Sequence, residues 1–205
     1  SSKGFTVVLG TNGTLLDKIT IEKLLSSGVK GVGISLDAAT PEFHDRFRGV
    51  DGSWGKTVEA IDALRGSGLS FQLQLTATKN NKDEIPALIK FACEKGAKAV
   101  NIFFLVCTGR GQRSTDLTPG EYEEILSYLA GAEREYSGAL MVRARCAPHF
   151  LRIASVKDPE SGLSRGATSG CIAGRGYLRI SPDGFVTPCP YMPVNERSQN
   201  LKDKG

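Results

Sequence analysis

Two cysteines near the carboxyl end of the sequence have the side chains and the spacing to hold a metal. Cys171 and Cys189 form the pattern C-x12-G-x4-C, with Ser181-Pro182-Asp183-Gly184 between them. This stretch predicts a hairpin, because Pro fixes φ and Gly accepts a positive φ. A tight hairpin returns the second cysteine towards the first, and thiolates bind soft metals and iron–sulfur clusters. The alternative, equally supported by this stretch alone, is a hairpin whose two cysteines are only packed.

The three other cysteines differ in their surroundings. Cys93 lies on an apolar helix pattern and is expected to pack in the core, and Cys107 ends a strand and is also expected to be structural. Cys146 precedes His149, but this spacing on one helical turn is poor for a nucleophile–base pair, so a metal ligand is the better interpretation. Five cysteines at irregular spacing argue against a disulfide scaffold and favour a reducing compartment, the cytoplasm.

Strand and helix patterns alternate through the first two thirds of the chain. Strands are expected at residues 5–9, 29–37, 69–78 and 99–106, and each is followed by a helical pattern. The first of these strands is expected to be fully buried. The alternation predicts a parallel α/β sheet, barrel-like, with too few strands to close a barrel. A further strand at 140–145, a short helix, a flexible loop at 158–170 and the hairpin follow.

Polar residues stand at the carboxyl ends of the expected strands. They include Thr11 and Asn12 after the first strand and Ser35 and Asp37 at the end of the second. Parallel α/β folds bind ligands at this edge of the sheet, so we expect a ligand site there. The alternatives are an ordinary Asn-Gly turn at Asn12 and a strand-end cap at Asp37.

Composition excludes some classes of function. The chain has 205 residues, a formal net charge of +4 and 40% hydrophobic residues, which suits one domain with a small appendix. It has no basic run of the kind that binds nucleic acid, and no apolar run approaches the roughly 18 residues of a membrane span. We therefore expect neither nucleic acid nor a membrane as a partner.

Three groups of residues resemble the core of the radical S-adenosylmethionine enzymes. They are Thr11-Asn12-Gly13 after a strand, Ser35-Leu36-Asp37 at the end of the next, and His44-Asp45 with Arg48-Gly49 and Gly52-Ser53. The hairpin from Cys171 to Cys189 resembles the opening of the SPASM (twitch-type) extension, which carries auxiliary iron–sulfur clusters.

Two further stretches resemble a narrower subgroup, which acts on tetrapyrroles in haem d1 and alternative haem biosynthesis. They are residues 145–150 and residues 108–111. Peptide-maturing SPASM enzymes are the main competing assignment.

This resemblance implies a partial (βα)6 barrel of about four parallel strands at residues 1–138, followed by the start of the extension at 139–205. It also implies an enzyme that generates a 5′-deoxyadenosyl radical from S-adenosylmethionine with a [4Fe–4S] cluster and modifies a tetrapyrrole, or alternatively a peptide. A flavodoxin or ferredoxin would be the electron donor.

The resemblance also implies roles for individual residues. Thr11, Asn12 and Gly13 would shape the pocket floor, and Ser35 and Asp37 would hold the carboxylate and ribose of the cofactor.

Three more residues complete the expected cofactor site, and three cysteines form the expected metal site. Gln74 and Thr76 would face the barrel interior, although a solvated polar pair is the alternative. Arg48 would pair with the cofactor carboxylate, with a surface salt bridge as the alternative. Cys146, Cys171 and Cys189 would bind one auxiliary cluster, with a fourth ligand elsewhere.

One defining feature of the family is missing from the sequence. The cysteines that hold the catalytic cluster are spaced C-x3-C-x2-C, and no cysteines here have that spacing. We therefore expect a fragment that lacks both this amino-terminal segment and the carboxyl-terminal cysteines, and is inactive alone. The alternatives are an iron–sulfur electron-transfer module without its own catalysis and a metal-free α/β domain.

Overall fold

The computed structural model describes residues 3–108, 116–157, 159, 171–195 and 198–204. The stretch 109–111 and almost all of the expected flexible loop at 158–170 lie outside the described residues. The elements run in the order β1 (Val8–Thr11), α1 (Lys18–Ser26), β2 (Gly31–Ser35), α2 (Pro41–Arg48), α3 (Ser53–Arg65), β3 (Ser70–Ala77), η1 (Lys82–Glu84), α4 (Ile85–Glu94), β4 (Ala99–Phe104), α5 (Pro119–Glu135), β5 (Met141–Arg145), α6 (Phe150–Lys157), β6 (Arg179–Ile180), β7 (Phe185–Thr187), β8 (Gln199–Asn200) and η3 (Leu201–Lys204).

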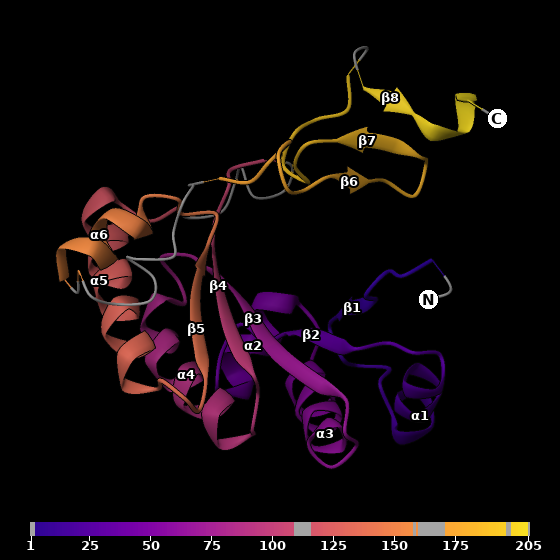
Figure 1. Cartoon of the computed structure of the whole chain (residues 1–205). Helices are drawn as coiled ribbons and strands as arrows, with labels where there is room; N and C mark the ends of the chain where they lie inside the picture. The colour runs from indigo at the N-terminus through magenta and orange to yellow at the C-terminus, as the bar shows by residue number, and fades with distance from the viewer. Residues whose placement is uncertain (1–2, 109–115, 158, 160–170, 196–197, 205) are drawn as a thin grey trace.

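The first five strands form one parallel sheet in the order β1-β2-β3-β4-β5 (Figure 1). This confirms the predicted parallel α/β fold but corrects the number of strands from about four to five. The fifth strand, Met141–Arg145, pairs in parallel with β4. The sheet therefore continues beyond residue 138, where the extension was expected to begin. Val142 of this strand is buried in the same core as the other strands.

The two faces of this sheet differ in chemistry. One face carries the apolar residues of β3, such as Leu73 and Leu75, which join the apolar stripes of the helices in one core. The other face, which we call the open face, carries the alternate residues of the same strands. The strand register places these side by side: Gly33, Ser35, Gln72, Gln74, Thr76, Asn101, Phe103, Arg143 and Arg145. The sequence prediction that Gln74 and Thr76 lie opposite Leu73 and Leu75 is confirmed.

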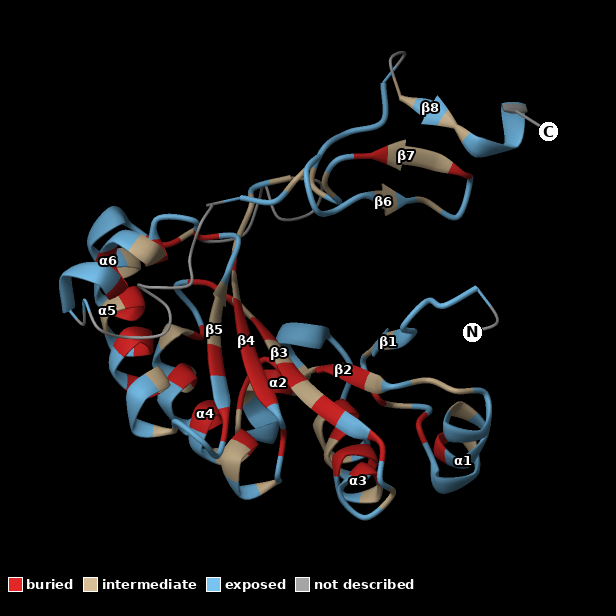
Figure 2. Cartoon of the chain, viewed as in Figure 1, coloured by how far each residue is buried: buried red, intermediate tan, exposed pale blue. Residues whose placement is uncertain are grey.

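The first strand is not fully buried, contrary to the prediction. It spans Val8–Thr11 rather than 5–9 and pairs only with β2, so it is an edge of the sheet. Phe5, which precedes the strand, and Val8, which lies on the open face, are 74% and 65% exposed. Figure 2 shows the contrast between this edge and the buried central strands β2, β3 and β4.

The predicted hairpin is present. Strands β6 and β7 pair antiparallel, and the amide of Gly184 donates to the carbonyl of Ser181 at 2.9 Å across the turn. Gly184 has a φ of 94°, which explains the need for glycine. The short strand β8, which the sequence did not predict, adds a third strand to this small sheet. Among the described helices, none is long and apolar enough to cross a membrane.

Candidate functional site

The turn after β1 is held against helix α3. The hydroxyl of Thr57 donates to the carbonyl of Asn12 at 2.9 Å, and the hydroxyl of Thr11 accepts from the amide of Gly13 at 3.1 Å. Gly13 has a φ of 83°, and a Cβ there would meet Ile34, Thr57 and Ala60 at about 3.5 Å. The three predicted residues therefore form a tightly packed turn at the carboxyl edge of the sheet.

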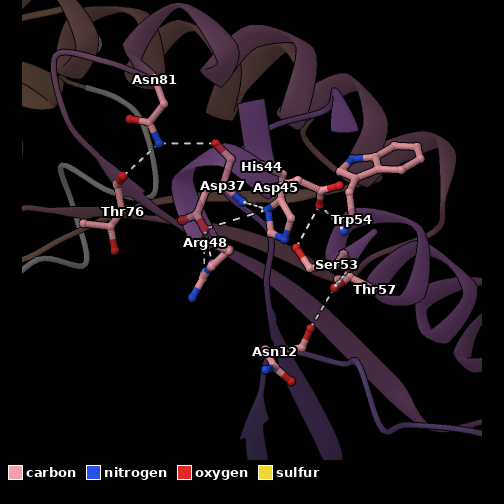
Figure 3. Close-up of polar contacts among 10 residues, drawn as sticks. All are labelled: Asn12, Asp37, His44, Asp45, Arg48, Ser53, Trp54, Thr57, Thr76 and Asn81. Carbon is pink, nitrogen blue, oxygen red and sulfur yellow. Dashed lines mark hydrogen bonds and ion pairs between the residues drawn. The ribbon is translucent and has the colours of Figure 1, made fainter. Parts of the chain in front are cut away.

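Asp37 lies in a buried cluster just after β2 (Figure 3). Its carboxylate accepts from Nε of Arg48 at 2.6 Å, and Nη2 of Arg48 lies 2.6 Å from the same oxygen. The amide of Asp37 donates to Nδ1 of His44 at 3.2 Å. The structure thus brings Asp37 and Arg48 together, and their charges face each other.

The pKa values in this cluster follow from burial. The pKa of Asp37 is raised, mainly by burial, against the opposing charges of Arg48 and His44. The pKa of His44 is lowered, again mainly by burial. A neutral imidazole leaves Nδ1 free to accept the amide hydrogen of Asp37.

Asp45 explains why the His44-Asp45 and Gly52-Ser53 stretches occur together. Its carboxylate accepts from the amide of Gly52 at 2.7 Å. It also accepts from the amide of Trp54 at 2.7 Å and from the hydroxyl of Ser53 at 2.8 Å (Figure 3). These bonds, that of the Trp54 amide above all, lower the pKa of Asp45. The N-cap position of α3 is Gly52, which has no side chain to accept a hydrogen bond, and Asp45 of α2 supplies the acceptor.

Asn81 joins the ends of β2 and β3, and sequence reasoning missed it. The side-chain amide donates to the carbonyls of Asp37 at 3.2 Å and Thr76 at 3.0 Å (Figure 3). Its oxygen accepts from the amide and hydroxyl of Thr78. The side chain is completely buried, so each of these groups would lose a partner without it.

We expect Asn81→Ala to lower the free energy of unfolding by about 2–3 kcal/mol, because it leaves buried carbonyls and an amide unpaired. Urea denaturation followed by circular dichroism measures this change. Asn80→Ala is the matched control, since Asn80 is exposed in the same turn. Equal midpoints for the two variants would contradict the assigned role of Asn81.

A chain of side-chain hydrogen bonds crosses the open face. Nε of Arg145 on β5 donates to the Asn101 oxygen on β4 at 2.9 Å, and Nδ2 of Asn101 donates to the Gln72 oxygen on β3 at 2.9 Å. Gln74 lies over Gly33, where a Cβ would come within 2.6 Å of its Nε2. Period-two alternation placed the glutamines on this face, but nothing in the sequence showed their link to Arg145.

A cavity of about 530 Å³ lies between the open face and the hairpin. Its lining includes Gln72, Gln74, Asn101, Phe103 and Arg145 from the sheet. The lining also includes all three cysteines predicted as metal ligands, which are Cys146, Cys171 and Cys189. Residues far apart in the sequence are thus brought to one space.

Cys146 has a strained backbone at this cavity. Its φ is 60°, and among the described residues it alone has a positive φ without being glycine. Burial raises the pKa of its thiol, which also has a hydrogen bond with Tyr191, and burial with that thiol raises the pKa of Tyr191 to about 12. Within the described ranges, no three His, Cys, Asp or Glu side chains lie close enough to hold a metal ion.

The other two cysteines lie elsewhere. Cys93 packs half-buried against the core, as predicted. Cys107 is exposed, and its Sγ lies 3.5 Å from a carboxylate oxygen of Asp116. Burial raises its pKa, and so does the contact with Asp116, which argues against a reactive thiolate.

One family model and several curated proteins match this chain. Residues 1–92 match the model of the Radical SAM superfamily. An AdoMet-dependent heme synthase of Methanosarcina barkeri is 38% identical over 211 residues, covering 98% of this chain and 60% of that protein. An AdoMet-dependent heme synthase of Nitratidesulfovibrio vulgaris is 34% identical over 205 residues, covering 95% of this chain and 55% of that protein. The chain thus spans little more than half the length of these relatives.

Solved structures share the fold. Streptococcus suis SuiB bound to S-adenosylmethionine superposes with a TM-score of 0.74 at 19% identity, over 96% of this chain and 45% of SuiB. SuiB has also been solved bound to the precursor peptide SuiA. At this identity the likeness concerns the arrangement of the sheet, its helices and the small sheet that follows.

Proposed function

We propose that this chain, whose residues 1–92 match the Radical SAM superfamily model, is part of an enzyme that uses S-adenosylmethionine to modify a tetrapyrrole in haem biosynthesis. The observation that carries this proposal is the open face of the sheet. Its polar side chains form one wall of a large cavity that is otherwise mainly apolar. The two relatives named AdoMet-dependent heme synthase support the substrate class.

The open face suits a polar cofactor on β1 and β2. Gly10 and Gly33 are paired neighbours there, and a Cβ on Gly10 would meet nothing within 4 Å. Ser35 and Gln74 also pair, and the side-chain amide of Gln74 lies over Gly33, so a hydroxyl and an amide group border the open backbone at Gly10. When bound with its catalytic cluster, S-adenosylmethionine supplies the 5′-deoxyadenosyl radical. We propose that these residues bind and orient the cofactor.

Asp37 and Arg48 act differently in this proposal from the roles that the resemblance implies. Because the buried carboxylate of Asp37 already pairs with Arg48, we propose that both position the chain after β2 rather than contact the cofactor through their charges. Thr11, Asn12 and Gly13 likewise act through the packed turn that they form. Thr76 remains a proposed contact from the open face.

In this proposal, the ligands of the catalytic and auxiliary iron–sulfur clusters come from different parts of the protein. None of the five cysteines has the C-x3-C-x2-C spacing, so no ligand of the catalytic cluster is assigned here. We propose that Cys146, Cys171 and Cys189 hold an auxiliary cluster with a fourth ligand from outside this chain. They line one cavity but are not close enough to share a metal, so binding would draw the hairpin towards β5. A flavodoxin or ferredoxin would deliver the electron.

The full-length protein, reconstituted anaerobically with iron and sulfide, tests this function. Incubation with dithionite, S-adenosylmethionine and a set of tetrapyrroles is expected to give 5′-deoxyadenosine and a change in the mass of one tetrapyrrole. Deoxyadenosine without any tetrapyrrole product, together with modification of a precursor peptide, would favour the peptide-maturing alternative. If no deoxyadenosine forms under any condition, the proposal that the protein is an enzyme is contradicted, and an electron-transfer module is favoured.

A further inference from the structure

The cavity has an uneven distribution of charge. Most of its wall is apolar or aromatic and includes Phe103, Phe150, Ile172 and Tyr177. Arg145 is the one charged side chain in the described lining, which contains no aspartate or glutamate. A ligand that occupies the part of this space left beside the proposed auxiliary cluster must therefore be largely apolar, and it is attracted to a single cationic side chain.

The guanidinium group of Arg145 is held in place by a chain of hydrogen bonds to the neighbouring strands. Its Nε is bound to Asn101, which is buried and is bound in turn to Gln72 on the next strand. Among the described residues, the guanidinium group forms its hydrogen bond through Nε, to Asn101. Within the described part of the chain, no carboxylate forms an ion pair with Arg145. A guanidinium group held by its Nε presents its terminal nitrogens to a ligand in the planar geometry that suits a carboxylate.

We propose that Arg145 binds a carboxylate of the tetrapyrrole and so selects an acidic macrocycle over a neutral one. This inference rests on the proposed function and names the group that the site recognises. Biosynthetic tetrapyrroles combine a flat apolar ring with carboxylate side chains at the rim, which matches an apolar cavity with one cation. Asn101 and Gln72 hold the Nε side of the guanidinium group and so orient it, and since both also line the cavity, their side chains border the bound macrocycle.

Equilibrium binding to the full-length, cluster-loaded protein tests this inference without turnover. The probes are coproporphyrin III, which carries four carboxylates, and its tetra-amide, which has nearly the same shape without charge. Fluorescence titration is expected to show that the wild-type protein binds the tetra-acid at least about tenfold more tightly, as a charge-assisted hydrogen bond would give. R145Q should remove this preference and leave tetra-amide binding unchanged.

R143Q is the matched control. Arg143 lies two residues away on the same strand and face, but contacts Met141 and does not line the cavity. Its affinity for the tetra-acid should stay within about threefold of wild type. R145K should retain part of the preference, since the charge remains while the forked geometry is lost.

The possible results distinguish a failure of the role proposed for Arg145 from a failure of the proposed substrate class. If wild type binds both probes equally well, or R145Q keeps the preference for the tetra-acid, the inference is overturned while the substrate class stands. If wild type binds neither probe, the proposed substrate class fails, and the inference fails with it. If R145Q loses cluster iron and the binding of both probes, Arg145 serves the cluster and the inference is overturned.

Discussion

Replacing Arg48 with methionine is expected to lower the free energy of unfolding by about 3 kcal/mol, the low end of the cost of leaving a buried charge unpaired. Asp37 would be that charge, since its side chain is only 2% exposed. Arg48 is itself 35% exposed, which places the cost at the low end. Urea denaturation at neutral pH measures the change.

Two variants show that the loss belongs to the ion pair. Arg46→Met makes the same substitution on the same helix, but Arg46 is exposed and lies over the ring of Phe43, so only a small loss is expected. The double variant D37N/R48M removes both charges and should recover much of the stability lost in R48M. A double variant no more stable than R48M would contradict an electrostatic origin.

The same pair predicts a dependence on pH. The pKa of Asp37 is raised in the folded protein, so the folded state binds this proton more tightly than the unfolded chain. Its contribution to stability is therefore greatest at low pH and falls as pH rises above the unfolded value of 3.8. Loss of Arg48 raises this pKa further, so the destabilisation of R48M should be smaller at pH 5 than at pH 7.5.

Replacing Cys171 or Cys189 with serine is expected to remove roughly four iron atoms from the full-length protein, the content of one [4Fe–4S] cluster. Both cysteines line the cavity that also receives Cys146, and serine is a poor ligand for iron in such clusters. Iron and sulfide analysis after anaerobic reconstitution measures the loss. Cys146→Ser should have the same effect, because Cys146 lines the same cavity.

Cys93→Ser is the control for this series. Cys93 packs against the core away from the cavity, so its variant should keep full iron content with some loss of stability. Equal iron content in the Cys93, Cys171 and Cys189 variants would show that the hairpin cysteines are only packed. That was the alternative interpretation of the C-x12-G-x4-C stretch.

Local patterns predicted most of the elements. Alternation along β3 placed Gln74 opposite Leu73, and the turn residues up to Gly184 placed the hairpin, because both depend on neighbours in the sequence. The fifth strand was expected to open the extension, but it pairs with β4 in the main sheet, and a strand of five residues with two arginines gives no sign of that pairing. Its buried residues were too few to show that it continues the sheet.

The long-range contacts of the site could not be predicted. Asn81 reaches Asp37 across 44 residues, and Arg145 reaches Asn101 across the same separation. A single asparagine in a polar turn has no periodic pattern, so its burial depends on tertiary packing alone. The Asp37–Arg48 pair was missed for a related reason: sequence shows that charges are present but not which charges meet.

The most direct test of the central claim is an anaerobic crystal structure of the full-length protein with S-adenosylmethionine. The claim is that the open face of the sheet binds the cofactor and directs it towards the cavity. We predict density for the cofactor beside Gly10, Gly33, Ser35 and Gln74, with the Asp37–Arg48 pair intact behind it. A cofactor bound on the helix-covered side, or one whose carboxylate has displaced Asp37 from Arg48, would contradict this account.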